Sequence, residues 1–349
     1  MVPFAGYEMP VQYPAGVLAE HNHTRTGASI FDVSHMGQVS VRGDDRVAAL
    51  ETLVPGDIAG LAPGRMRYTM FTNDAGGILD DLMVTNVGDS LFLVVNAACK
   101  DADIAHLRAH LPTGITVDVL DDRSLIALQG PAAAAVLARH VPGAATMPFM
   151  SALPFVIDGS RLAVTRSGYT GEDGYEISIP SDDAVRITEL VLAEDGVELA
   201  GLGARDSLRL EAGLCLYGHD IDETTTPVEA ALTWSIAKRR REEGGFPGAA
   251  IIQQQIADGV SRKRVGILPD GKAPAREGTE ITDADGAPIG TVTSGGFGPS
   301  AGGPIAMGYV DAAHAVKDTP VNLVVRGTPR PGRIAPIPFV PNRYYREQE

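Results

Sequence analysis

The stretch RSGYTGEDGYEI, residues 166–177, shows most clearly how this chain folds. An apolar run at residues 162–164 precedes it and apolar residues alternate from Tyr175 to Ile179, a pattern that predicts two strands joined by a glycine-rich turn. Side chains alternate between the faces of a strand, so Glu176 points away from the face that carries Tyr175 and Ile177. One interpretation is a tight turn with solvated acids, and the other is that Glu176 contacts a ligand.

The composition indicates a loop-rich globular protein. Of 349 residues, 44% are hydrophobic, 40 are Gly and 24 are Pro, which favours many turns and short strands over a helical bundle. A net charge of −15 argues against general binding to nucleic acid or to a membrane surface. Two cysteines, Cys99 and Cys215, are too few for a disulfide framework or a zinc site. Residues 1–6 lack the pattern of a signal peptide, so we expect a cytoplasmic protein.

Two acids follow a buried strand at residues 91–95. The apolar spacing from Ile104 to Leu111 predicts a helix there, and Asp101 and Asp103 fall in its first turn, where the helix dipole favours an anion. These acids are either a helix cap and a first-turn acid or carboxylates that face a ligand.

Other titratable residues give weaker signals. Asp80 and Asp81 are adjacent in a predicted strand and would point to opposite faces, so we expect one buried partner and one solvated acid rather than a catalytic pair. His106 and His110 lack a third ligand and indicate a solvated helix face, so no metal site is predicted. His35 precedes a strand, where a structural role is commoner than a catalytic one.

The second half of the chain carries cations. Residues 201–206 lack the third glycine of a dinucleotide loop, so we reject a Rossmann site. Arg205 would lie in the first turn of a helix, where a cation is unfavourable, which suggests that it serves a carboxylate or a ligand and that the helix's charges have partners. A helix is predicted from Pro227 to Trp234. It leads into the basic run 238–241, which is either a solvated face or a surface that steers an acidic partner.

From residue 262 short apolar runs separated by glycines predict a β-barrel or sandwich.

Five segments closely resemble signatures of the aminomethyltransferase (T-protein) family of the glycine cleavage system. They are FDVSHMG at 31–37, RSGYTGEDGYEI at 166–177, GARDSLRLEAGLCLYG at 203–218, KRRREEGGFPG at 238–248 and PFVPNRYY at 338–345. The resemblance covers essentially the whole chain. It implies an α+β, multidomain folate-binding fold around a central pocket with a C-terminal all-β barrel. We expect one lobe from residues 1–45 and 125–200, a second from 46–124 and 201–257, and the barrel from 262–349.

The resemblance also implies an activity. The methylene carbon of an aminomethyl group, held on the lipoyl arm of H-protein, would pass to tetrahydrofolate with release of ammonia. Tetrahydrofolate would be a co-substrate and no metal would be needed. H-protein would be the direct partner, with the P-protein and L-protein of glycine cleavage involved indirectly.

The family pattern assigns residues to these roles. The catalytic aspartate lies seven residues after the Asn of the VVN strand end, which from Asn96 gives Asp103 rather than Asp101. An anionic Asp103 would stabilise developing positive charge and take up a proton. The expected ligand-binding residues are Glu176, Arg205, Tyr169, Asn96 and Tyr344, while Glu172 and Asp173 are expected to be turn residues. H-proteins are acidic, so the expected docking residues are Lys238, Arg239 and Arg240.

Two relatives of this fold remain as alternatives. One is a folate-dependent demethylase of a small amine or sulfonium compound, which would not use H-protein. The other is a folate-binding protein of iron–sulfur cluster maintenance, whose Lys-Gly-Cys signature is absent from residues 238–245.

Overall fold

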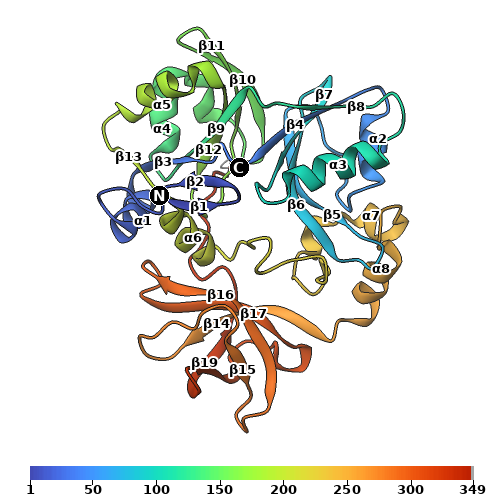
Figure 1. The fold of residues 1–349 in the computed structure, drawn as a ribbon, viewed down its shortest axis with the longest axis vertical. Coiled ribbons are helices and arrows are strands. Elements are labelled where there is room, and N and C mark those ends of the chain that lie inside the picture. The colour runs from blue at the N-terminus through green and yellow to red at the C-terminus, as the bar shows by residue number, and fades with distance from the viewer. Residues whose placement is uncertain (347–349) are drawn as a thin grey trace. The chain divides into compact units, whose positions relative to one another are not determined.

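The computed structural model describes residues 1–346, and its ribbon is drawn in Figure 1. The chain forms two compact units. The first comprises residues 1–71, 80–205 and the C-terminal residues from 343 onward, and the second comprises residues 72–79 and 206–342. None of the helices within residues 1–346 has the length and apolar character needed to cross a bilayer.

A six-stranded sheet forms one part of the first unit, in the order β10-β11-β12-β9-β3-β13. Its strands are β3 (Ala28–Asp32), β9 (Arg123–Gln129), β10 (Ala152–Ile157), β11 (Ser160–Thr165), β12 (Gly174–Pro180) and β13 (Val197–Leu199). Apolar residues of the sheet pack against α4 (Ala133–His140) and α5 (Ala184–Leu192), with Leu137, Tyr175, Ile177 and Ile187 fully buried. The predicted hairpin is therefore β11 and β12, which pair antiparallel.

A five-stranded sheet has the order β5-β6-β7-β4-β8. Its strands are β4 (Gly37–Arg42), β5 (Arg65–Thr72), β6 (Ile78–Asn86), β7 (Ser90–Val95) and β8 (Thr116–Val119). Strand β4 pairs with β7 and β8, so it belongs to this sheet although the predicted first lobe, residues 1–45, includes it. Helix α3 (Lys100–His110) follows β7 after a short turn.

The remaining elements of the first unit are short. They are β1 (Val2–Phe4), β2 (Tyr7–Met9), α1 (Val17–Thr26), α2 (Arg46–Glu51) and the 3₁₀ turns η1 (Pro142–Thr146) and η2 (Ser181–Asp183). Strands β1 and β2 form a separate antiparallel hairpin at the N-terminus.

The second unit contains a closed barrel in the order β14-β17-β16-β15-β18-β19, which confirms the predicted barrel. Its elements are β14 (Arg262–Pro269), β15 (Glu280–Thr282), β16 (Pro288–Gly298), β17 (Gly303–Asp311), η4 (Ala312–His314), β18 (Pro320–Val325) and β19 (Thr328–Ala335). Apolar side chains such as Ile267, Ile281 and Leu323 fill its interior.

Three helical segments precede the barrel: η3 (Thr233–Ser235), α7 (Lys238–Glu243) and α8 (Ala249–Asp258). The helix predicted from Pro227 to Trp234 is wrong, since only the 3₁₀ turn η3 forms there. The physical reason is Ala231, whose φ of +57° is incompatible with a right-handed helix.

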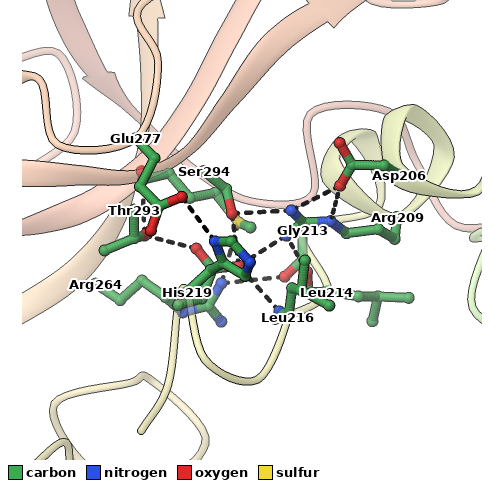
Figure 2. A network of polar contacts seen from close by, with 12 residues as sticks. Asp206, Arg209, Gly213, Leu214, Leu216, His219, Arg264, Glu277, Thr293 and Ser294 are labelled. Carbon is green, nitrogen blue, oxygen red and sulfur yellow. Dashed lines mark hydrogen bonds and ion pairs between the residues drawn. The ribbon is translucent and has the colours of Figure 1, made fainter. Parts of the chain in front are cut away.

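Helix α6 (Leu202–Glu211) carries the charges whose partners were expected, and Figure 2 shows those of its C-terminal part. Arg209 donates to Asp206 Oδ1 at 2.9 Å, to Asp220 Oδ2 at 2.7 Å and to Ser294 Oγ at 2.9 Å. Asp220 and Arg209 are both buried. Because Ser294 lies on β16, these charge-assisted hydrogen bonds attach the segment after α6 to the barrel.

Candidate active site

Asp103 lies in the first turn of α3, as predicted, but it is not a solvated acid. Its backbone N–H donates to Cys99 O at 2.9 Å, and only 3% of the residue is exposed. Its Oδ2 is buried and accepts or donates no hydrogen bond within the described part of the chain. A buried oxygen without a partner has a strong tendency to bind a polar group of a ligand.

Asn96 follows the last residue of β7 and donates hydrogen bonds to two carboxyl groups of β6. Its backbone N donates to Asp80 Oδ2 at 3.0 Å, and its Nδ2 donates to Asp80 Oδ1 at 2.9 Å and to Asp81 Oδ1 at 2.7 Å. The Tyr68 hydroxyl donates to the other oxygen of Asp81 at 2.9 Å. One amide therefore holds two adjacent carboxyl groups, and the charge of Asp80 also acts on the pKa of Asp103.

The prediction for Asp80 and Asp81 was wrong in one respect. Asp80 is the buried partner that was expected, with 0% of the residue exposed, but Asp81 accepts hydrogen bonds from Asn96 and Tyr68 instead of being solvated. Asn96 follows the end of β7, where its amide reaches both side chains. Alternation along β6 therefore does not keep the two carboxyl groups from sharing a partner, because the Asn96 amide at the end of the neighbouring strand contacts both.

Burial raises the pKa values of the three carboxyl groups of Asp80, Asp81 and Asp103. Burial, followed by the charge of Asp80 and the hydrogen bond to it, raises the pKa of Asp103 from 3.8 to about 10. Burial, followed by the charge of Asp80, raises the pKa of Asp81 to about 7. Burial also raises the pKa of Asp80, against the opposing hydrogen bonds from Asp103, Asn96 and Cys99. The raised pKa favours the protonated form of Asp103 in the free protein, whereas the role expected from the sequence used its anion.

Cys99 stands just before α3 and does not have the properties of a nucleophile. Burial and then the nearby charges of Asp80 and Asp103 raise the pKa of its thiol far above the ordinary value. A thiol whose pKa is raised stays protonated at neutral pH, so it is a poor nucleophile, but it can donate a hydrogen bond.

A second polar group forms around Glu176 on β12. Ser167 Oγ donates to Glu176 Oε2 at 3.0 Å, and burial raises the pKa of Glu176 while the charge of Arg205 and the Ser167 hydrogen bond lower it. Arg205 lies 4.6 Å from the centre of the Tyr169 ring, and its Nη1 is buried with no hydrogen-bond partner among the described residues. Three of the predicted residues, Glu176, Arg205 and Tyr169, are thus brought together.

The turn between β11 and β12 needs its glycines because Gln129 passes close to them. A Cβ on Gly168 would lie 1.8 Å from Gln129 Oε1, and a Cβ on Gly174 would lie 2.5 Å from Leu128 O. The Gln129 amide donates to Ser167 O at 2.9 Å and accepts from Thr170 Oγ1 at 2.8 Å. Gln129 therefore fixes the turn that places Tyr169 and Ser167 beside Glu176.

The expectation that Glu172 and Asp173 are merely turn residues is wrong. The side chain of Glu172 is 0% exposed and accepts from Arg25 Nη1 at 2.7 Å and from Arg343 Nη2 at 2.6 Å. Asp173 accepts two hydrogen bonds from Arg166, at 2.9 and 2.6 Å. Glu172 attaches the C-terminal segment to the turn, while Asp173 pairs with Arg166 on the other side of the same turn. The arginines that pair with Glu172 lie far away in the sequence and left no local signal.

Tyr344 lies in that C-terminal segment, where its ring stacks on Phe149 with 4.3 Å between centroids. Burial raises its pKa to about 12, with smaller effects of Arg25 and Glu172. The neighbouring Arg343 N–H donates to Gly171 O at 2.7 Å, so the segment that carries Tyr344 lies against the turn between β11 and β12.

His35 is buried, and both Arg205 and Lys100 in the first turn of α3 act on it electrostatically. The sequence did not indicate this burial. Its ring packs edge-on against Phe4 at 5.5 Å, and burial, followed by the charge of Arg205, lowers its pKa to about 4. His35 is therefore neutral at pH 7 and lies near both Arg205 and α3.

Two family models match the chain. The GCVT N-terminal domain matches residues 1–240, and the glycine cleavage T-protein C-terminal barrel domain matches residues 262–341. The chain belongs to the glycine cleavage T-protein family. The resemblance read from the five sequence segments is thereby confirmed.

Relatives of this family member match over nearly its whole length. The aminomethyltransferase of Dictyostelium discoideum is 51% identical and that of Gallus gallus 50%, each over 99% of this chain and 90% of the relative. The glycine cleavage aminomethyltransferase T of Bartonella henselae has a solved structure that superimposes with a TM-score of 0.94 at 46% identity, over 99% of this chain and 95% of that chain.

These names correct one expectation about this T-protein family member. The Dictyostelium, Flaveria and Gallus relatives are all named mitochondrial aminomethyltransferases, which contradicts the cytoplasmic location expected from the sequence. A low cysteine count indicates a reducing environment and does not single out the cytoplasm.

The basic run of this T-protein family member lies on α7 of the second unit. Lys238 has an 88% exposed side chain with its Nζ 3.7 Å from Glu242, and Arg239 pairs with Glu243 at 2.8 Å. Arg240 is only 4% exposed and lies over the Phe246 ring at 5.3 Å. The side chain of Arg240 is therefore buried in the second unit, whereas Lys238 and Arg239 reach the surface.

Proposed function

We propose that this protein is a tetrahydrofolate-dependent aminomethyltransferase of glycine cleavage. It would transfer the methylene carbon of an aminomethyl group on lipoylated H-protein to tetrahydrofolate and release ammonia. The observation that carries the proposal is the buried Asp103 carboxyl with an unpaired oxygen, in a chain that matches the T-protein family over nearly its full length.

Glu176 would orient the folate. A reduced pterin presents an amide N–H beside an amino group, and a carboxylate can accept both hydrogen bonds. The Glu176 carboxyl is known to receive one hydrogen bond, from Ser167, which leaves acceptor capacity for such a donor pair. The unpaired Nη1 of Arg205 would donate to an acceptor of the same ligand, with the Tyr169 ring beside it. The residues therefore fit a ligand that has both donors and acceptors.

Asn96 was predicted to bind a ligand, and its contacts favour a different role. Its Nδ2 is directed to Asp80 and Asp81, so we propose that it positions these carboxyl groups instead. Tyr344, which stacks on Phe149 and follows Arg343, the partner of Glu172, would line the same pocket.

Asp103 would act on the aminomethyl group. Ammonia leaves a carbon readily only when its nitrogen carries a proton, and a carboxyl that is protonated at neutral pH can supply it. Holding the donor carbon and the folate nitrogen in register would supply further acceleration.

H-protein would dock on a surface that includes Lys238 and Arg239. Both lie at the surface of a chain whose net charge is −15, so a local cationic surface would help to orient an acidic partner. The P-protein and L-protein would act on H-protein before and after this step, without touching this chain.

The test is ammonia release from aminomethyl-loaded H-protein with and without tetrahydrofolate. We expect release to depend on tetrahydrofolate and to fall by about 10²–10⁴-fold in Asp103→Asn, the usual effect of removing a general acid or base. Asp101→Asn is the matched control, because Asp101 is an exposed acid in the same helical turn. Wild-type activity in Asp103→Asn would refute the catalytic assignment, and turnover of small amines without H-protein would refute the substrate.

A further inference from the structure

The single tryptophan of the chain lies at the surface of the second unit. Trp234 is the middle residue of η3, four residues before the basic helix α7, and 66% of it is exposed. Tryptophan is highly buried on average, and it is among the residues enriched at the energetic centres of protein interfaces. The exposed ring of Trp234 is therefore a candidate contact for a partner.

The Trp234 ring lines a groove of about 400 Å³, which we call the Trp234 groove. Val228 comes from the segment before η3, Ile256 from α8 and Val260 from the linker to the barrel, so a large part of the lining is apolar. Lys263, an exposed residue of β14, adds a cation to the lining. Such a groove suits an apolar group that has an anion beside it.

Hydrogen bonds connect the elements on which this groove is built. The Arg241 side chain of α7 donates from Nε to Ile236 O and from Nη2 to Thr233 O, both at 2.6 Å. The Gln253 amide of α8 donates to Arg241 O at 2.8 Å. The backbone around Trp234 is thus attached to both helices before any partner binds, which reduces the entropy that binding must cost.

The charge around the groove is positive, although the chain has a net charge of −15. Helix α7 contributes four cations and two acids, and the exposed Lys263 and Asp258 balance each other, so the formal charge of these residues is +2. The cations Lys238 and Arg239 reach the surface. The partner that complements this surface is therefore acidic.

We propose that the Trp234 groove is the apolar centre of the surface on which H-protein docks. This inference rests on the proposed function, in which the acidic H-protein carries the aminomethyl group. The Trp234 ring would cover an apolar patch of H-protein, while α7 and Lys263 face its acids. Exposed ion pairs contribute little affinity, whereas a tryptophan at the centre of an interface contributes much of it. The groove thus supplies affinity and the cations supply orientation.

The first experiment uses the full-length wild-type sequence and needs no variant. Because Trp234 is the only tryptophan, protein labelled with fluorotryptophan has one ¹⁹F resonance, which the tryptophans of unlabelled H-protein cannot obscure. Adding lipoylated H-protein should shift this resonance in a saturable way, and its H₂O–D₂O isotope shift should fall as the ring becomes buried. If calorimetry shows that H-protein binds while the resonance and its isotope shift stay unchanged, the inference is overturned and the proposed function stands. No binding of H-protein at all would overturn both.

The second experiment measures the Kd for H-protein in variants whose folding is checked by circular dichroism. Trp234→Ala should raise this Kd by about 10-fold or more, and the loss of activity should appear in the KM for H-protein rather than in kcat. Lys263→Glu should also weaken binding, and more so at low salt. Lys317→Glu is the matched control, because Lys317 is a 68% exposed lysine of the same unit that does not line the groove. A folded Trp234→Ala protein with the wild-type Kd, or equal effects of the two lysine variants, would refute docking at this groove.

Discussion

Replacing Asp103 with Asn should make the first unit more stable while it removes most of the activity. The folded protein holds a proton on Asp103, whose pKa is about 10 against an ordinary value of 3.8, so folding at neutral pH takes up about one proton. An asparagine has nearly the same shape and cannot ionise. The variant therefore avoids the free energy needed to protonate this carboxyl.

The size of the effect follows from the two pKa values. Each pH unit between them is worth about 1.4 kcal/mol, and pH 7 lies about three units above the unfolded value, so the upper limit is about 4 kcal/mol. Relaxation around the buried pair reduces this, and we expect a gain of about 2–4 kcal/mol at pH 7. A raised pKa stabilises fully below the unfolded value and loses its contribution as pH rises toward the folded value. The advantage of Asp103→Asn should thus grow from about pH 4 to about pH 10.

The assay must report on the unit that contains Asp103. The single tryptophan is Trp234, which lies in the second unit, so its fluorescence would follow the wrong part of the chain. Amide hydrogen exchange of β6 and α3, measured at several pH values for the wild type and the variant, follows the right one. Parallel pH dependences of the two proteins, or a less stable variant at pH 8, would refute the raised pKa.

Four other substitutions test the remaining assignments. Glu172→Gln should lower the unfolding free energy of the first unit by about 3 kcal/mol, because it removes the carboxylate that pairs with the buried Arg25 guanidinium. Arg343→Ala should change it by about 1 kcal/mol or less, because the Arg343 side chain is 51% exposed. Urea denaturation followed by circular dichroism would measure both changes. Glu176→Gln should raise the Kd for tetrahydrofolate by about 10-fold or more in calorimetric titration, and an unchanged Kd would remove Glu176 from the pocket. Lys238→Glu should weaken association with H-protein mostly through a slower on-rate that depends on salt, and salt-independent binding would contradict a docking role.

Local patterns were enough to predict several parts of the structure. Alternation after the glycine-rich turn placed Glu176 on a strand, and the apolar spacing from Ile104 onward placed Asp103 in the first turn of a helix. The short apolar runs after residue 262 indicated the barrel. In each case a period of two or of about 3.6 residues reports on burial over a few neighbouring positions.

Contacts between distant segments could not be predicted in this way. Glu172 meets Arg25 and Arg343, which are 147 and 171 residues away in the chain. Arg240 belongs to a run of cations, and nothing local shows that its side chain is buried over the Phe246 ring. The residues themselves are unremarkable, and their roles depend on which strands and helices the fold brings beside them.

The two carboxyl groups of the proposed site differ in their surroundings, and this difference suits their separate tasks. Among the described residues, the charged groups that act on the pKa of Asp103 are the acids Asp80 and Asp81, which together with burial raise it far above the ordinary value. Burial also raises the pKa of Glu176, but Arg205 and Ser167 reduce that rise, and the carboxylate form is the one that can accept from a pterin. Raising the pH should therefore favour folate binding at Glu176 while it removes the proton that Asp103 supplies. A rate that depends on both groups must pass through a maximum, and its alkaline side belongs to Asp103.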